Sequence, residues 1–144
     1  MIAIGSDHGG VNLKKTIVEH LQKNKIEVKD YGTYRAEAVD YPDIVRVVGQ
    51  AITNGECQRG ILICGTGIGV SIAANKIHGL RAALCTNGTM AKLSRQHNDA
   101  NILALGERIL GVELALEIVD TWIKSEFEGE RHQIRVNKMM QIEQ

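Results

Sequence analysis

A cysteine followed by a run of glycines is the most specific chemical feature of this 144-residue sequence. Cys64 ends an apolar run that begins at Gly60, and it leads directly into Gly65-Thr66-Gly67-Ile68-Gly69. Glycines at the start of a helix leave backbone N–H groups free to bind a phosphate or a developing oxyanion. A thiol beside such groups loses its proton more easily, which would allow Cys64 to act as a base. The alternative is that Cys64 is a small hydrophobic residue closing a buried strand.

A dinucleotide is the rival ligand for this glycine loop. The spacing is G-x-G-x-G rather than G-x-G-x-x-G, and the loop follows the third expected strand instead of the first. No acidic residue ends a strand at the distance that a dinucleotide site requires. The sequence therefore favours a phosphate or oxyanion site, and it predicts no bound cofactor.

Two further segments carry groups that exchange protons or bind anions. Asp7-His8-Gly9-Gly10 follows the first expected strand, and Arg95-Gln96-His97-Asn98-Asp99 precedes the fifth. Histidine exchanges protons near neutral pH, so His97 could serve as an acid or base, although a histidine that caps a helix C-terminus is an ordinary alternative. A metal site at His97 and Asp99 is conceivable, but one histidine and one carboxylate are too few ligands, so we predict no metal site.

Two arginines near the end of the chain could bind an anion. Arg131 and Arg135 are four residues apart, so a helix would present them on the same side. Each guanidinium can donate two hydrogen bonds to phosphate oxygens. The alternative is a solvated, charged helix face. The pair does not belong to a general basic excess, because 17 basic residues balance 17 acidic ones.

The elements that must position these groups follow an alternating pattern. Short apolar runs, each expected to form a strand, alternate with longer amphipathic stretches, which is typical of βα units on a parallel sheet. We expect strands at 2–6, 27–31, 60–64, 81–85 and 101–105, and helices at 13–21, 42–55, 68–74, 89–96, 111–127 and from 131 to the end. Ligands of open parallel sheets bind beyond the carboxyl ends of the strands, so the sheet could bring all three chemical segments to one crevice.

Composition limits the function further. The length and the 44% of hydrophobic residues suit one domain over 1–144. Zero net charge and 3% aromatic residues argue against a nucleic-acid partner, and no apolar run is long enough for a membrane span. Three cysteines without paired spacing are expected to be free thiols, with structural roles for Cys57 and Cys85. We expect a cytoplasmic protein without a membrane partner.

Five segments, spread over essentially the whole chain, form one pattern. They are Ser6-Asp7-His8-Gly9-Gly10, Asp40-Tyr41-Pro42-Asp43, Cys64-Gly65-Thr66-Gly67-Ile68-Gly69, Arg95-Gln96-His97-Asn98-Asp99 and Gly129-Glu130-Arg131-His132. In order and spacing they resemble the type B ribose-5-phosphate isomerases, a family that includes the galactose-6-phosphate isomerase subunits. The resemblance implies a Rossmann-like three-layer α/β sandwich with a five-stranded parallel sheet. It also implies a homodimer or dimer of dimers, with the C-terminal helix packing on the partner subunit.

The resemblance also implies roles for individual residues in a metal-independent isomerisation of a sugar phosphate. Cys64 would move the proton between C1 and C2, and His97 would open the furanose ring. Thr66 and Asn98 would lie near the enediolate and the base. The other expected substrate-binding residues are Asp7, His8, Tyr41, Gly65, Gly67, Ile68, Gly69, Arg108, Arg131, His132 and Arg135. Some members use a glutamate as base, but Asn75 stands near that place here, so Cys64 remains the candidate.

Two alternative functions stay open. An isomerase for a six-carbon sugar phosphate, such as galactose 6-phosphate or allose 6-phosphate, would use the same groups. A module that binds a nucleotide or sugar phosphate without turnover would need the glycine loop, but it would not need a reactive Cys64 or His97. The resemblance favours interconversion of ribose 5-phosphate and ribulose 5-phosphate through a cis-enediol, as in the pentose phosphate pathway.

Overall fold

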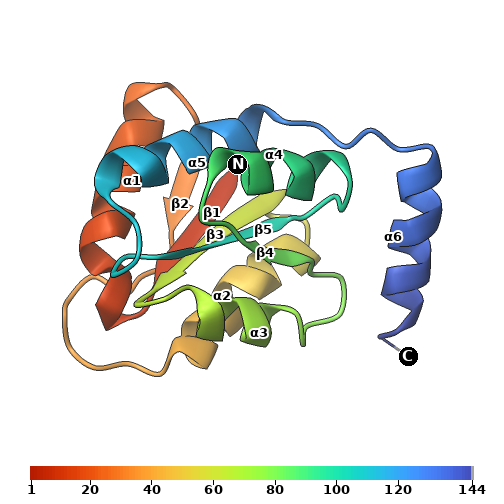
Figure 1. Cartoon of the computed structure of the whole chain (residues 1–144). Coiled ribbons are helices and arrows are strands. Elements are labelled where there is room, and N and C mark those ends of the chain that lie inside the picture. The colour runs from red at the N-terminus through yellow and green to blue at the C-terminus, as the bar shows by residue number, and fades with distance from the viewer. Residues whose placement is uncertain (144) are drawn as a thin grey trace.

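A five-stranded, all-parallel sheet lies between two layers of helices in the computed structural model, which describes residues 1–143 (Figure 1). The elements are β1 (Ile2–Ser6), a 3-10 turn (His8–Gly10), α1 (Val11–Lys23), β2 (Val28–Asp30), α2 (Tyr41–Thr53), β3 (Arg59–Cys64), α3 (Ile68–Ala74), β4 (Ala82–Leu84), α4 (Gly88–Gln96), β5 (Ile102–Gly106), α5 (Val112–Lys124) and α6 (Arg131–Gln141). The strand order is β2-β1-β3-β5-β4. The predicted three-layer α/β fold is confirmed.

The sheet divides the hydrophobic core in two. Helices α1, α4 and α5 cover one face, with Ile17, Ile118 and Trp122 fully buried there. Helices α2 and α3 cover the other face around Val48 and Val70. Because both faces are covered, β1 and β5 are buried along their whole length, as expected of continuous apolar runs in a parallel sheet. Burial on both faces fixes where each strand ends, and so where its loop begins.

Most element boundaries lie within one to three residues of the sequence-based expectation, and β2 and α5 are among those that differ. Strand β2 covers only Val28–Asp30, although the N–H of Ile2 donates to the carbonyl of Glu27 and the N–H of Tyr31 to the carbonyl of Ile4, so backbone pairing with β1 reaches both expected ends. Helix α5 ends at Lys124 rather than near residue 127. The next residue, Ser125, is extended and donates a side-chain hydrogen bond of 2.6 Å to the carbonyl of Thr121, which caps the helix.

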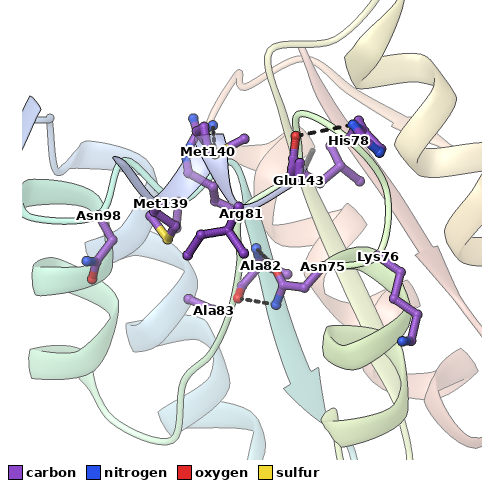
Figure 2. Close-up of a pocket in the computed structure, with 13 residues that line it drawn as sticks. Asn75, Lys76, His78, Arg81, Ala82, Ala83, Asn98, Met139, Met140 and Glu143 are labelled. Atoms are coloured by element: carbon purple, nitrogen blue, oxygen red, sulfur yellow. Dashed lines mark hydrogen bonds and ion pairs between the residues drawn. The ribbon is translucent and has the colours of Figure 1, made fainter. Parts of the chain in front are cut away.

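The C-terminal helix α6 stands apart from the three layers. An extended segment after α5 carries the chain to α6, which lies beyond the β4 edge of the sheet (Figure 1). A cavity of about 530 Å³ separates the two, with Ala82, Ala83 and Arg81 on one side and Met139 and Met140 on the other (Figure 2). Ile134 and Met139 of α6 are exposed. Among residues 1–143, no helix has both the length and the hydropathy to cross a bilayer.

Candidate active site

The strand order reverses between β1 and β3, and the best-formed group of functional side chains lies at this point. From β1 the chain continues to one side of the sheet and from β3 to the other, and the carboxyl ends of strands at such a switch point are where open parallel sheets bind ligands. The N–H of Asp7 donates to the carbonyl of Ile63 at 3.2 Å. A Cβ atom on Gly9 would lie 3.2 Å from the nitrogen of Gly65, so the loops after the two strands touch.

Cys64 is the last residue of β3 and lies at this switch point. The residue is only 6% exposed, and its Sγ accepts a hydrogen bond of 3.1 Å from the N–H of Gly67. The Oγ1 of Thr66 accepts from the N–H of Ile68 at 3.2 Å. Within residues 1–143 the N–H groups of Thr66 and Gly69 have no hydrogen-bond partner. The thiol therefore lies beside amide groups that can donate to a developing oxyanion.

Two glycines allow the loop to close over β5. Gly67 has a φ of 81°, in the left-handed region, and a Cβ there would lie 2.6 Å from the Cδ1 of Leu84. A Cβ on Gly106 would lie 2.5 Å from the carbonyl carbon of Thr66. Only glycine fits at either position without a shift of the backbone. The motif that suggested anion binding thus also brings the loop against the sheet.

Other expected substrate-binding residues lie around the same switch point. The Nδ1 of His8 accepts a hydrogen bond from the N–H of Val39 at 3.2 Å. The ring of Tyr41 lies against Gly69, where an added Cβ would approach it to 2.9 Å. The guanidinium of Arg108 lies over Gly65 at 3.4 Å from such a Cβ. We call this group the Cys64 cluster; it comprises Asp7, His8, Tyr41, the loop 64–69 and Arg108.

A second group gathers around His97, and it lies elsewhere. His97 caps the C-terminus of α4, as the alternative interpretation anticipated, and its ring stacks on that of His132 with centroids 4.3 Å apart. Burial and the nearby charges of His97 and Arg131 lower the pKa of His132, which favours its neutral form. Asn98 and Arg135 line the same cavity of about 360 Å³. We call His97, Asn98, Arg131, His132 and Arg135 the His97 cluster.

One chain does not bring the two clusters together. In the ladder between β3 and β5, Gly60 pairs with Ile102 and Cys64 pairs with Gly106. Cys64 is thus at the carboxyl edge of the sheet, whereas His97 precedes the amino end of β5. Four residues of strand separate these edges by roughly 13 Å. The expectation of one crevice is therefore wrong within a single chain for His97, although it holds for the segments after β1 and β3.

The sequence reasoning missed Glu128. This carboxylate lies in the segment between α5 and α6, and its Oε1 is 3.6 Å from the Nε2 of His97 and 3.5 Å from the Nε2 of His132. We predicted no metal site because we compared His97 only with its neighbours in the sequence. The structure brings three ligand-bearing side chains together from two helices and the segment that joins α5 to α6.

We expect the three cysteines to differ in reactivity. Cys57 and Cys85 are each 1% exposed, and burial raises the pKa of Cys85 to about 11, so at pH 8 only about one molecule in a thousand carries the Cys85 thiolate. Iodoacetamide at pH 8, followed by peptide mass mapping, should modify Cys64 first, and inorganic phosphate should slow that modification. Equal rates of modification at Cys64 and Cys85 would contradict the expectation that Cys64 is the more reactive thiol.

Comparison with known proteins agrees with this geometry. A family model described as ribose/galactose isomerase matches residues 2–139. Ribose-5-phosphate isomerase B of Escherichia coli is 52% identical over 143 residues, which cover 99% of this chain and 96% of that protein. A structure of Clostridium thermocellum ribose-5-phosphate isomerase B has a TM-score of 0.97 and 62% identity, covering 99% and 96% of the two chains.

A third relative was solved with a sugar phosphate. The crystal structure of ribose-5-phosphate isomerase B from Mycoplasma genitalium, with bound ribulose 5-phosphate, is 44% identical, with a TM-score of 0.94 and coverage of 99% and 95%. The family match and the structural superposition both cover the residues of the Cys64 cluster and of the His97 cluster. This chain therefore belongs to the ribose/galactose isomerase family.

Proposed function

We propose that this protein interconverts ribose 5-phosphate and ribulose 5-phosphate through a cis-enediolate, with Cys64 as the base. The observation that carries the proposal is the position of the Cys64 thiol at the switch point of the sheet, next to the unpartnered amides of Thr66 and Gly69. The proton next to a carbonyl is only weakly acidic, so the reaction needs a base about 3 Å away and donors for the enediolate oxygens. The Cys64 cluster offers both.

The proton transfers balance within the substrate and Cys64. The thiolate of Cys64 removes the proton from C2 of the open-chain aldose, and the electron pair forms the C1–C2 double bond while O1 becomes the oxyanion. The proton of the O2 hydroxyl then moves to O1 as O2 becomes the ketone oxygen. The thiol returns its proton to C1, and the electron pair of the double bond forms that C–H bond.

Ring opening must precede this step, because the furanose has no free carbonyl group. We assign it to His97, because an imidazole can both accept and donate a proton. Since His97 and Cys64 of one chain lie at opposite edges of the sheet, His97 would have to come from a second copy. We therefore propose a homodimer in which each active site combines the Cys64 cluster of one subunit with the His97 cluster of its partner.

The surfaces of both clusters fit this arrangement. Ile68 and Ile72 are exposed on α3, the helix that follows the Cys64 loop. Met90 is exposed on α4. Ile134 and Met139 are exposed on α6, the helix that stands apart from its own sheet. Pairing two such faces buries apolar surface that one chain leaves in water.

In this dimer the arginines of α6 would bind the phosphate. Arg131 and Arg135 are exposed at the His97 cluster, and Arg108 would approach the same group from the Cys64 cluster. Holding the phosphate fixes the flexible open chain in register with the base, which turns remote binding energy into orientation. Asp7, His8, Tyr41 and Asn98 would bind sugar hydroxyls.

We expect Arg135→Ala to raise KM for ribose 5-phosphate by about 10- to 100-fold, the loss of one charge-assisted contact. The fall in kcat should be smaller than the rise in KM. Lys138→Ala, which removes another exposed cation from α6, is the matched control and should leave KM unchanged. An equal rise in KM for both variants would mean that α6 attracts the substrate only through general charge.

The need for a reduced thiol also suggests the cellular compartment of the protein. Cys64 must remain unoxidised to accept a proton, and Cys57, Cys64 and Cys85 are all free. Reduced thiols persist in the cytoplasm, and we propose this as the compartment.

The substrate is tested by comparing kcat/KM for ribose 5-phosphate, allose 6-phosphate and galactose 6-phosphate on the purified chain, with sedimentation under the same conditions. We expect turnover to be most efficient with ribose 5-phosphate, and the active species to contain at least two copies. Higher kcat/KM with either six-carbon sugar would transfer the assignment to that substrate. An active monomer would contradict the shared site.

A further inference from the structure

Three metal-ligating side chains converge in the His97 cluster. The Oε1 of Glu128 lies between the Nε2 atoms of His97 and His132, at 3.6 and 3.5 Å, and all three ligand atoms lie within 4.8 Å of one another. The segment that carries Glu128 is held in place, because its N–H donates to the carbonyl of Gln96 at 3.0 Å. The backbone positions of the three residues are therefore set by α4, α6 and the connection that precedes α6.

These distances are too long for hydrogen bonds and suit a shared ion. A hydrogen bond between imidazole and carboxylate would place nitrogen and oxygen about 2.7 to 3.2 Å apart. In tetrahedral zinc sites with ligand bonds of about 2.0 to 2.1 Å, neighbouring ligand atoms are about 3.4 Å apart. The two distances from the Oε1 of Glu128 to the histidine nitrogens, 3.6 and 3.5 Å, are close to that value. Two histidines and one glutamate form a ligand set that zinc uses in sites with an open fourth position.

A second, independent observation points to a ligand. The Nε2 of His132 is buried without any hydrogen-bond partner among the described residues, and His132 as a whole is only 6% exposed. A buried nitrogen without a partner is costly, and a bound ion would satisfy it. The stacked rings of His97 and His132 do not yet aim both lone pairs at one point. His97 is 39% exposed at its side chain, so its ring is free to make the rotation that is needed.

We propose that His97, Glu128 and His132 form a binding site for one divalent transition-metal ion such as Zn²⁺, and that the bound ion inhibits the isomerase. The inhibition rests on the proposed function, because it follows from the role of His97 in ring opening. A nitrogen lone pair that coordinates a metal ion is not available to exchange a proton with the sugar. Arg135 lines the same cavity and repels a cation, so we expect moderate affinity and a reversible effect.

Binding is measured on the full chain, freed of metal with a chelator, by titration with Co²⁺ in phosphate-free buffer and displacement by Zn²⁺. We expect one Co²⁺ per chain, with the visible absorption of a low-coordinate site. Glu128→Gln and His132→Gln should each weaken binding by more than the roughly 10- to 100-fold that loss of an outer partner costs. Glu128 is half exposed, so its variant tests the site without disturbing the core.

Two controls separate this site from other ligands. His20→Gln removes a histidine that also faces a carboxylate, Asp120, at 2.7 Å, but has no third ligand, so this variant should bind as the native chain does. Cys64→Ser removes the other group that could capture zinc, and it too should bind Co²⁺ normally. Loss of binding in Cys64→Ser, or unchanged binding in both Glu128→Gln and His132→Gln, would overturn the proposal.

The inhibition is measured separately, as the Zn²⁺ concentration that halves turnover of ribose 5-phosphate, relative to the metal-free rate of each variant. Glu128→Gln should require at least about tenfold more Zn²⁺ than the native chain and His20→Gln the same amount, in line with the loss of a ligand. An active enzyme that binds no Co²⁺ would refute the metal site alone. A chain that binds Co²⁺ but isomerises none of the sugars would refute the proposed function and leave the metal site standing.

Discussion

Replacing Cys64 with alanine should lower kcat for ribose 5-phosphate by about 1,000-fold, which lies within the range that a positioned general base contributes. The thiol accepts a hydrogen bond from the N–H of Gly67 and so lies beside the free amides of the glycine loop. Substrate binding should change little, because in the proposed dimer the phosphate is held by arginine side chains and not by the thiol. Stopped-flow turnover, together with equilibrium binding of ribose 5-phosphate, gives both quantities.

A matched control comes from another buried cysteine. Cys85→Ala removes the same atom from the opposite face of the sheet, where the thiol only approaches the carbonyl of Ala83 at 3.8 Å. This variant should retain kcat within about twofold, with at most a small loss of stability from the cavity. If Cys64→Ala kept most of its turnover, Cys64 would not be the base.

The second large effect is the recovery of activity from two inactive chains. We expect Cys64→Ala and His97→Gln to be inactive alone. When the two chains are co-expressed with different tags, random pairing gives half heterodimers, each with one intact site, and so about one quarter of the native activity. The intact site takes Cys64 from one chain and His97 from the other.

A chain that carries both substitutions is the control for this experiment. Paired with either single variant, it cannot supply an intact site and should restore nothing. The mixed pair of single variants should also lose its activity on dilution below the dissociation constant of the dimer. No recovery from purified heterodimers would mean that the two clusters do not act on one substrate.

Much of the fold could be predicted from the sequence because burial on both faces leaves a clear pattern. The runs at 2–6 and 60–64 are mostly apolar, and both form strands as expected, the second extended by Arg59. The end of α5 could not be placed in this way. Its last turn is closed by the side chain of Ser125, a local hydrogen bond that hydrophobic periodicity does not report.

The candidate site could be predicted only in part, because some of its residues follow the ends of strands and others do not. The glycine loop and the segment after β1 are tied to strand ends, so strand order alone brings Asp7 next to Cys64. His97 precedes β5, and attention to the direction of that strand could have placed it at the amino edge. Glu128 lies in a connection without periodicity, and only the folded chain brings it to His132.

The central claim is that this chain moves a proton between C1 and C2 of a pentose phosphate. The most direct test is to incubate the purified protein with ribose 5-phosphate in heavy water containing a metal chelator, and to follow the sugar by NMR. We predict formation of ribulose 5-phosphate with deuterium incorporated at C1, since the base exchanges its proton with solvent. Absence of product, or product that carries no deuterium at C1, would contradict the account.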